Sequence, residues 1–366
     1  MTAGERAHAL DDGAIMRHAL SLAERGWGQT APNPMVGAVV VRDGVVVGEG
    51  FHSRYGAPHA EIEALRAAGD AARGATMYVT LEPCNHFGQT PPCTEAIITA
   101  GISRVIVATR DPHEIARGGA DQLRDNGVDV VIGVEEDAAR ELNAPFFYAL
   151  KSNRAFVQLK VALSLDGALT DHTRKRGWLT GPEARREVHR LRAGSDAVGV
   201  GLGTARTDDP ALTVRDFEPA PRVAPARIVF DTSARLHLDS RLVLTAREQP
   251  TIVVCWAPDP AHAAALEHAG VTLVHAASLA DALVELRSSG IRSILIEGGA
   301  ALATSFLQEA LVDRLIIFRA PLILGGGSLN AFGGLPPTTL GDATRWRMVD
   351  SRKFGDDEMT IYAPPT

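Results

Sequence analysis

Four side chains near the beginning of the chain have the types and spacing of a metal-dependent hydrolytic site. His59 and Glu61 stand two residues apart, and Cys84 and Cys93 follow with eight residues between them. One imidazole and two thiolates leave the fourth tetrahedral position of zinc open for water, as a catalytic zinc site requires. Zinc lowers the pKa of that water toward about 7, and Glu61 is close enough to move a proton without binding the metal. The pattern predicts hydrolytic deamination.

Other interpretations of these residues stay open. Zinc deaminases usually have two residues between their cysteines, not eight. His86 could supply a fourth ligand, which would make the zinc site structural and closed. A lone histidine or cysteine is also commonly a core residue, and we expect this of the third cysteine, Cys255, inside an apolar run.

Glycine clusters in the second half are candidates for phosphate binding. Gly298-Gly299 precedes a predicted helix, and Gly325–Gly327 follows an apolar segment. Such junctions expose backbone N–H groups to a phosphate, although they also serve as ordinary turns. Gly199, Gly201 and Gly203 alternate without the spacing of a dinucleotide-binding fingerprint.

We expect strands and helices that alternate along the chain to position these residues. This alternation indicates an α/β layered fold. The polar segment 151–154 predicts a boundary between domains 1–152 and 153–366. In the first domain, Asp43-Gly44 between β-branched runs predicts a hairpin. We expect strands at 36–41, 45–47, 75–81, 104–108 and 128–132, and helices at 14–25, 60–72, 94–100, 120–125 and 135–142.

The second domain continues the same alternation and then changes. We expect strands at 156–163, 197–200, 228–230, 251–254, 291–296 and 315–318, and helices at 182–192, 260–269, 279–288 and 301–310. Two late strands, 346–350 and 359–362, have no helix between them. They predict an antiparallel edge on a mostly parallel sheet.

Composition limits the kinds of partner. A chain of 366 residues with 45% apolar and 22% charged residues is typical of a two-domain globular protein. No segment approaches the roughly 20 apolar residues that span a bilayer, and three cysteines indicate a reducing compartment. Residues 1–150 contain 12 arginines and no lysine against 20 acidic residues, a poor balance for binding nucleic acid. We expect a cytoplasmic protein without nucleic-acid or membrane partners.

The sequence resembles one family over nearly its whole length. In the first half the resemblance lies in residues 30–39, 48–52 and 58–61, and in residues 81–93, which match that family's insertion between the cysteines. In the second half it lies in Leu159-Lys160 and in residues 164–167, 208–215 and 296–299. The family is the bifunctional diaminohydroxyphosphoribosylaminopyrimidine deaminase / 5-amino-6-(5-phosphoribosylamino)uracil reductase of riboflavin biosynthesis.

For the first domain, the resemblance implies a cytidine-deaminase-like α/β/α fold that holds zinc through His59, Cys84 and Cys93. Its substrate is a phosphorylated pyrimidine, 2,5-diamino-6-(5-phosphoribosylamino)pyrimidin-4-one, and Glu61 is the proton shuttle. The implied substrate contacts are Asn33, His52, Asn85 and His86. Gln89 stands where the family usually has lysine or arginine, and His113 where it usually has asparagine.

For the second domain, the resemblance implies a dihydrofolate-reductase-like α/β fold and hydride transfer from NADPH to the ribose, giving 5-amino-6-(5-phosphoribitylamino)uracil. Arg192 and Arg215 have the chemistry to bind the 5′-phosphate. Trp178 could instead be a core residue. The implied cofactor contacts are Ala162, Trp178, Thr204, Asp208, Thr232, Gly299, Ala300, Ala301, Leu302, Ala303, Thr304 and Ser305. The implied substrate contacts are Arg176, Arg192, Leu212, Arg215 and Glu297, although Arg176 replaces the family's small hydroxyl residue.

We also expect a homo-oligomer, either a dimer or a tetramer. Three rival functions are a deaminase of single-stranded or flipped bases in nucleic acid, a zinc-stabilised binding protein without catalysis, and an enzyme with one active half. The acidic first half and the large second domain oppose the first, Glu61 beside His59 opposes the second, and motifs in both halves oppose the third.

Overall fold

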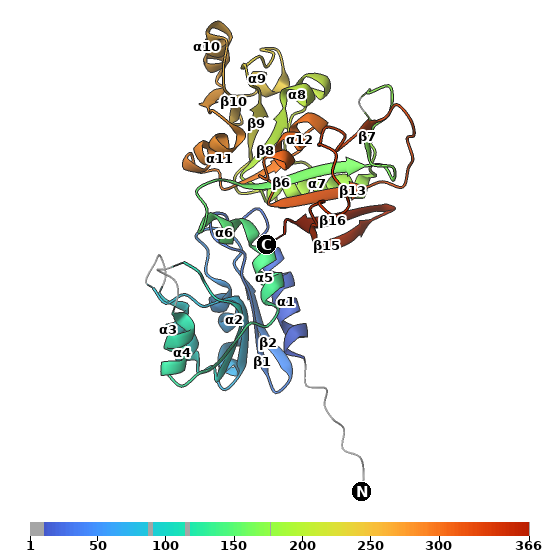
Figure 1. The fold of residues 1–366 in the computed structure, drawn as a ribbon. Helices are drawn as coiled ribbons and strands as arrows, with labels where there is room; N and C mark the ends of the chain where they lie inside the picture. The colour runs from blue at the N-terminus through green and yellow to red at the C-terminus, as the bar shows by residue number, and fades with distance from the viewer. Residues whose placement is uncertain (1–10, 87–90, 114–117, 176, 366) are drawn as a thin grey trace. The chain divides into compact units, whose positions relative to one another are not determined.

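The protein is described here from a computed structural model, in which residues 11–86, 91–113, 118–175 and 177–365 are described. The chain divides into two compact units, Met1–Lys151 and Ser152–Thr366. Figure 1 shows that each unit is built from helices packed on a β-sheet.

The first unit contains a five-stranded sheet in the order β2-β1-β3-β4-β5. One core cluster packs α2, α3 and α4 on one face of this sheet, and a second packs α1 and α5 on the other. The unit is therefore the predicted α/β/α sandwich. Its elements are α1 (Asp12–Glu24), β1 (Gly37–Arg42), β2 (Val45–Phe51), α2 (Ala60–Ala68), the 3₁₀ helix η1 (Gly69–Ala72), β3 (Thr76–Leu81), α3 (Cys93–Ala100), β4 (Arg104–Thr109), α4 (Gly119–Asp125), β5 (Asp129–Ile132), α5 (Glu136–Leu142) and α6 (Ala144–Ala149).

Two local features of this unit position helix α2, which carries Glu61. The predicted hairpin is confirmed: β1 and β2 pair antiparallel, and Asp43 and Gly44 have φ angles of 53° and 76°, as a two-residue turn with positive φ requires. Gly50 lets α2 lie directly on β2, because a Cβ atom at that position would be 2.3 Å from the carbonyl oxygen of Ala60. The start of α2 is thereby fixed against the sheet.

The second unit contains a nine-stranded sheet in the order β11-β10-β9-β8-β12-β6-β13-β16-β15 and a small two-stranded sheet, β14-β7. Its first elements are β6 (Phe156–Leu163), β7 (Ala168–Thr170), α7 (Pro182–Ala193), β8 (Ala197–Gly201), α8 (Leu202–Asp208), β9 (Ala226–Phe230), α9 (Arg241–Leu244), β10 (Thr251–Cys255) and α10 (Pro260–Ala269). The remaining ones are β11 (Thr272–His275), α11 (Leu279–Ser288), β12 (Ser293–Ile296), α12 (Ala300–Gln308), β13 (Arg314–Arg319), β14 (Leu329–Asn330), β15 (Arg347–Phe354) and β16 (Asp357–Ala363).

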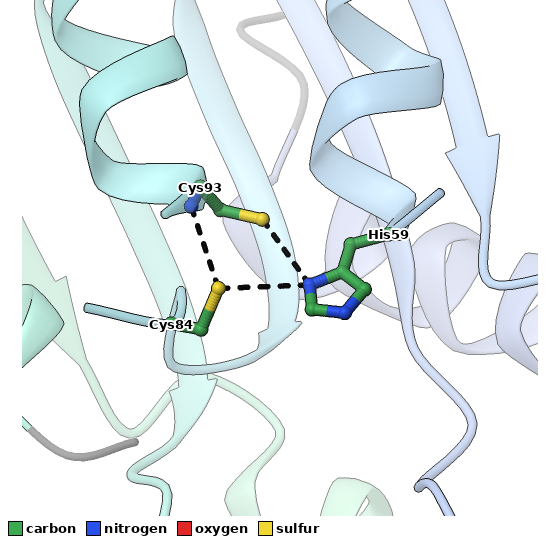
Figure 2. A group of neighbouring side chains, drawn as sticks. All are labelled: His59, Cys84 and Cys93. Atoms are coloured by element: carbon green, nitrogen blue, oxygen red, sulfur yellow. Dashed lines mark hydrogen bonds between the residues drawn. The ribbon is translucent and has the colours of Figure 1, made fainter. Parts of the chain in front are cut away.

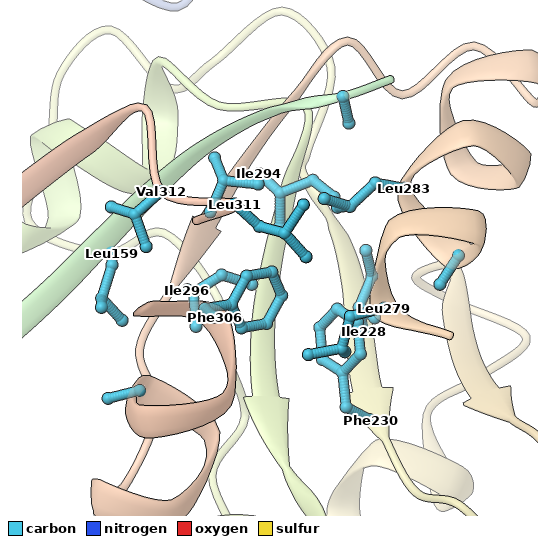
Figure 3. Packing of buried hydrophobic residues seen from close by; sticks show 14 of the residues in the cluster. Leu159, Ile228, Phe230, Leu279, Leu283, Ile294, Ile296, Phe306, Leu311 and Val312 are labelled. Atoms are coloured by element: carbon cyan, nitrogen blue, oxygen red, sulfur yellow. The ribbon is translucent and has the colours of Figure 1, made fainter. Parts of the chain in front are cut away.

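The large sheet is parallel except at one edge. β16 pairs antiparallel with both β13 and β15, which confirms the antiparallel edge expected from the two late strands. Phe306 of α12 packs edge-on against Phe230 of β9, with ring centroids 5.4 Å apart, inside the main core of this unit (Figure 3). This packing fixes α12 against the strands whose ends carry the predicted reductase residues.

The short elements α6, β7, α8, α9, β11 and β14 were not expected from the sequence. Within the described ranges, no helix combines the length and apolar character needed to cross a membrane.

Candidate active sites

Three elements of the first unit bring the predicted zinc ligands together, as Figure 2 shows. His59 directly precedes α2, Cys84 lies in the loop after β3, and Cys93 is the first residue of α3. The Nδ1 atom of His59 lies 3.6 Å from the Sγ atom of Cys84 and 3.3 Å from that of Cys93. Ligand atoms bonded to one tetrahedral zinc ion lie about 3.6 Å apart at the usual bond lengths. These side chains therefore fit a zinc ion, and His59 presents Nδ1 to it.

Hydrogen bonds inside this group set its charge states. A hydrogen bond with the Cys93 side chain lowers the pKa of Cys84 to about 4, so Cys84 is a thiolate at neutral pH. The hydrogen bond with Cys84 raises the pKa of His59 to about 8, and the same thiolate raises the pKa of Cys93. Because a metal ion binds neutral histidine and deprotonated cysteine, binding by all three groups releases protons.

Glu61 lies beside this group without belonging to it. It occupies the first turn of α2 and is only 3% exposed. Burial raises the pKa of its carboxyl group, while His59 opposes that effect. A buried carboxyl group two residues from a ligand has the placement expected of the predicted proton shuttle.

The closed structural zinc site is not supported. Among the described residues, the cluster of metal-ligating side chains consists of His59, Cys84 and Cys93 and does not include His86. Cys255, the last residue of β10, is fully buried in a core cluster of the second unit, as expected from its apolar surroundings.

His52 fixes the orientation of Asn33 at the same site. The Nδ1 atom of His52 lies 3.1 Å from the carbonyl oxygen of Pro58, and its Nε2 atom lies 3.3 Å from Nδ2 of Asn33. Burial lowers the pKa of His52, so the ring is neutral and donates from Nδ1 to Pro58. Nε2 of His52 then accepts from the side-chain amide of Asn33. The side-chain oxygen of Asn33 is left available to an amino group of a ligand. The two His rings meet edge-on, with His52 and His59 centroids 5.6 Å apart.

The other predicted deaminase contacts are placed less completely. Asn85 and His86 follow the ligand Cys84, and both are partly buried. The Nδ1 atom of His86 is buried and has no hydrogen-bond partner among the described residues. His113 lies in a turn where its backbone N–H donates to Asp111 over 2.8 Å. Gln89 lies outside the described residues.

In the second unit, the start of α12 offers backbone donors at the end of β12. Among the described residues, no side chain caps this helix, and the N–H of Gly299 donates to the hydroxyl oxygen of Thr204 on α8 over 3.2 Å. Free N–H groups at a helix start suit a cofactor pyrophosphate, so this junction fits NADPH. Ala303 and Thr304 are buried, whereas Ala300, Ala301, Leu302 and Ser305 are at least partly exposed.

A partly buried charge cluster lies beyond the end of β12. The Glu297 carboxylate accepts hydrogen bonds from Nε and Nη2 of Arg192, at 2.5 and 3.1 Å. Burial lowers the pKa of Lys160 on β6, and Glu297 opposes that effect. Burial would raise the pKa of Glu297, but Arg192 and Lys160 outweigh it and lower this pKa to about 2. The cluster therefore holds one carboxylate between two cations.

Helix α7 also holds the segment that carries Arg215. Nη1 of Arg192 donates to the carbonyl oxygen of Thr213 over 2.8 Å, and the backbone N–H of Arg215 donates to Nδ1 of His189 over 3.2 Å. Arg215 itself donates to the Thr213 hydroxyl over 3.1 Å. Arg192 is thus bonded to protein groups, while Leu212 is 3% exposed and part of the core.

The remaining predicted cofactor residues differ in exposure. Trp178 is 70% exposed, with the Arg185 guanidinium 5.3 Å from the centre of its ring, so the core interpretation of Trp178 was wrong. Thr232 follows β9 and is exposed, and its carbonyl oxygen accepts from Trp256 and Ala257. Ala162 lies on β6 and Asp208 is the last residue of α8. Arg176 lies outside the described residues.

Three residues of these sites were assigned no role from the sequence. Lys160 breaks the apolar run of a central strand, which is a detectable signal for a functional lysine. His189 precedes Arg192 by one helical turn, but its contact with Arg215 spans 26 residues. Glu82 stands two residues before the ligand Cys84, and its hydrogen-bond partners are distant in sequence, so only the fold reveals them.

Comparisons with known proteins agree with this geometry. Residues 10–109 match the family described as the cytidine and deoxycytidylate deaminase zinc-binding region, and residues 155–360 match the RibD C-terminal domain. The chain is 43% identical to the riboflavin biosynthesis protein RibD of Aquifex aeolicus, over 96% of this chain and 98% of that one. It is 39% identical to RibD of Escherichia coli, over 95% of this chain and 98% of that one.

Solved structures give the same result. RibD of Acinetobacter baumannii is similar with a TM-score of 0.82 and 37% identity, covering 97% of this chain and 99% of that one. A diaminohydroxyphosphoribosylaminopyrimidine deaminase / 5-amino-6-(5-phosphoribosylamino)uracil reductase of Thermotoga maritima is similar with a TM-score of 0.80 and 34% identity, with the same coverage.

Proposed function

Because the chain belongs to the RibD family of bifunctional deaminase/reductases of riboflavin biosynthesis, we propose a division of its two reactions between named residues. The chain is a zinc-dependent deaminase and an NADPH-dependent reductase that acts on a small pyrimidine substrate. Residues 1–152 form the deaminase domain and residues 153–366 the reductase domain.

In the deaminase domain, His59, Cys84 and Cys93 hold zinc, which when bound supplies an activated water for hydrolysis of the amino group. Glu61 takes a proton from the attacking water and delivers it to the departing nitrogen, so that ammonia leaves and a carbonyl group remains. Asn33 accepts from the pyrimidine amino edge through its side-chain oxygen, held by His52. Asn85 and His86 line the same site. The observation that carries this assignment is the ligand triad beside the buried carboxyl group of Glu61.

In the reductase domain, NADPH when bound supplies the hydride that reduces the ribose C1′ atom. Gly299 to Ser305 bind the cofactor at the start of α12, together with Ala162, Trp178, Thr204, Asp208 and Thr232. Glu297 and Arg192 hold the substrate at the end of β12, and Arg215 binds its phosphate. Arg176 and Leu212 complete the proposed substrate contacts. The partly buried ion pair of Arg192 and Glu297 supports this placement.

A coupled assay tests both reactions. The purified chain is given the diaminopyrimidinone ribose phosphate with and without NADPH, and ammonia release and NADPH oxidation are followed together. We expect ammonia in both cases, and NADPH oxidation only after deamination. Ammonia release without NADPH oxidation would contradict the reductase assignment. Absence of both ammonia release and NADPH oxidation would contradict both assignments.

We also propose that the chain works as a homo-oligomer, either a dimer or a tetramer, in the cytoplasm and without nucleic-acid or membrane partners. Light scattering of the purified protein tests the first part, and a single-chain mass would contradict it. A salt-dependent binding measurement with single-stranded DNA and RNA tests the absence of nucleic-acid partners.

A further inference from the structure

The segment 209–216, which carries the proposed phosphate contact Arg215, has an irregular backbone. All of its residues are described, and none belongs to a helix or a strand. Asp209, Leu212 and Asp216 have positive φ angles of 39°, 51° and 52°. A bulky residue such as leucine rarely adopts this left-handed conformation, because its Cβ atom crowds the backbone there. Contacts with the rest of the unit must therefore hold the segment in this shape.

Two side chains of helix α7 supply such contacts at the end of the segment. Nη1 of Arg192 donates to the carbonyl oxygen of Thr213 over 2.8 Å, and Nδ1 of His189 accepts from the backbone N–H of Arg215 over 3.2 Å. His189 and Arg192 stand three residues apart, so they lie on the same face of the helix. One face of α7 therefore binds the backbone on both sides of residue 214.

The protonation state of His189 suits its part of this contact. The side chain is buried, with 9% of the residue exposed. Burial lowers the pKa of His189, and the charges of Arg192 and Arg215 add to that effect, while Glu297 and Asp216 oppose it. The ring is therefore neutral near pH 7, with its proton on Nε2 and a lone pair on Nδ1 to accept from the backbone.

The side chain of Arg215 extends from the backbone that His189 binds. Arg215 is exposed, and its Nη1 atom donates to the hydroxyl oxygen of Thr213 over 3.1 Å. Arg192 contacts the carbonyl oxygen of the same threonine, so Thr213 brings the two guanidinium groups to one place. A guanidinium has five N–H donors, and a single contact with Thr213 does not exhaust its capacity to bind phosphate.

We propose that His189 is a positioning residue of the reductase: its Nδ1 atom fixes the backbone of Arg215, so that the Arg215 guanidinium is held ready for the 5′-phosphate of the substrate. The proposal rests on the phosphate-binding function proposed above for Arg215. His189 acts through Arg215 and needs no contact with the substrate or the cofactor. Its role is therefore in substrate binding and not in hydride transfer.

Replacing His189 by leucine in the full chain removes the ring acceptor and keeps a side chain that can be buried. The backbone N–H of Arg215 loses its partner, so we expect the KM for the deaminated, phosphorylated substrate to rise at least about tenfold. The reductase kcat should stay within about threefold of wild type. In asparagine an acceptor oxygen is bonded to Cγ, as Nδ1 is in histidine, so His189→Asn should keep the KM within about threefold of wild type.

The same substrate without its 5′-phosphate separates this role from a general effect on the fold. Its kcat/KM should agree within about twofold between wild type and His189→Leu, because it makes no contact that depends on the position of Arg215. His268→Leu is the matched control, since it makes the same substitution at an exposed histidine of α10 that is assigned to neither site. Its KM for the phosphorylated substrate should equal that of wild type.

Each outcome decides the proposal. An unchanged KM in His189→Leu would overturn it, and so would equal losses with and without the 5′-phosphate, which would make His189 a residue of the fold alone. A KM in His189→Asn as high as in His189→Leu would contradict the acceptor role. If His189→Leu does not yield folded protein, His189→Ala provides the same test, because the vacated volume admits water to the Arg215 N–H while the fixed acceptor is lost.

Failure of the proposed function would give different results. Wild-type protein that does not reduce the deaminated substrate with NADPH would refute the reductase assignment. An unchanged KM in Arg215→Ala would refute the assignment of Arg215 to the phosphate. A raised KM in Arg215→Ala together with an unchanged KM in His189→Leu would overturn the role of His189 alone.

Discussion

Replacing Glu297 by glutamine tests the charge cluster of the reductase unit, because this carboxylate compensates two partly buried cations, Lys160 and Arg192. Its side chain is 13% exposed and accepts two hydrogen bonds from Arg192. Burial alone would raise the pKa of Glu297, but Arg192 and Lys160 lower it from 4.5 to about 2. A pKa difference of this size between the folded and the unfolded chain corresponds to about 3 kcal/mol of stability near neutral pH. We therefore expect Glu297→Gln to lower the free energy of unfolding of this unit by about that amount.

The pH dependence of this loss has a definite sign. A carboxylate with a lower pKa in the folded state stabilises the fold above its unfolded pKa, and the stabilisation disappears as the pH falls toward the folded pKa. The difference in unfolding free energy between wild type and Glu297→Gln should therefore be constant from pH 7 to about 5.5. It should decrease by about 1 kcal/mol by pH 4 and continue to decrease toward pH 2.

Urea unfolding followed by tryptophan fluorescence measures this difference. Trp178, Trp256 and Trp346 belong to the second unit, so the signal reports mainly on the reductase. Reduction should fall while deamination stays near wild type. A difference below about 1 kcal/mol at pH 7, or one that does not change between pH 7 and pH 4, would refute the conclusion that Glu297 is charged and compensates these two cations.

Three further substitutions test the proposed sites. Cys84→Ser should remove most of the approximately one zinc per chain, measured by elemental analysis, while Cys255→Ser in the core should keep it; full zinc in Cys84→Ser would refute the ligand assignment. Glu61→Gln should keep zinc and reduction but lower the deaminase kcat by roughly 10²–10⁴-fold, and a loss under about tenfold would reject the shuttle role. Asp208→Ala should weaken NADPH binding in a fluorescence titration and slow reduction, with ammonia release and zinc unchanged. Parallel loss of both activities and of stability would instead make Asp208 structural.

Much of the fold could be predicted because long apolar runs and turn residues are local signals. The hairpin at Asp43-Gly44 depends on two positions that need positive φ, and the sequence supplies residues that tolerate it. Elements such as α9, with four residues, and β14, with two, are too short to show a period. They form because the surrounding chain packs against them.

The functional sites, like the fold, have features that the sequence predicts and features that only the structure shows. The zinc ligands could be predicted because the chemistry of zinc restricts residue type and spacing. The partners of Arg192 could not, because Glu297 lies 105 residues away and the carbonyl oxygen of Thr213 carries no side-chain signal. The exposure of Trp178 was also undetermined, since a tryptophan in a loop suits a core or a ligand surface equally well.

The strand order of the reductase sheet has a consequence for how the chain is made. β6 is the first strand of its unit, yet it lies between β12 and β13, which follow more than 100 residues later. β13 in turn pairs with β16, at residues 357–363. During synthesis, β6 cannot pair with its neighbouring strands until most of its unit has been synthesised. The five strands of the first unit, in contrast, are complete by residue 132. The deaminase unit can therefore fold early in synthesis, whereas the reductase sheet stays incomplete until its last strand has been synthesised.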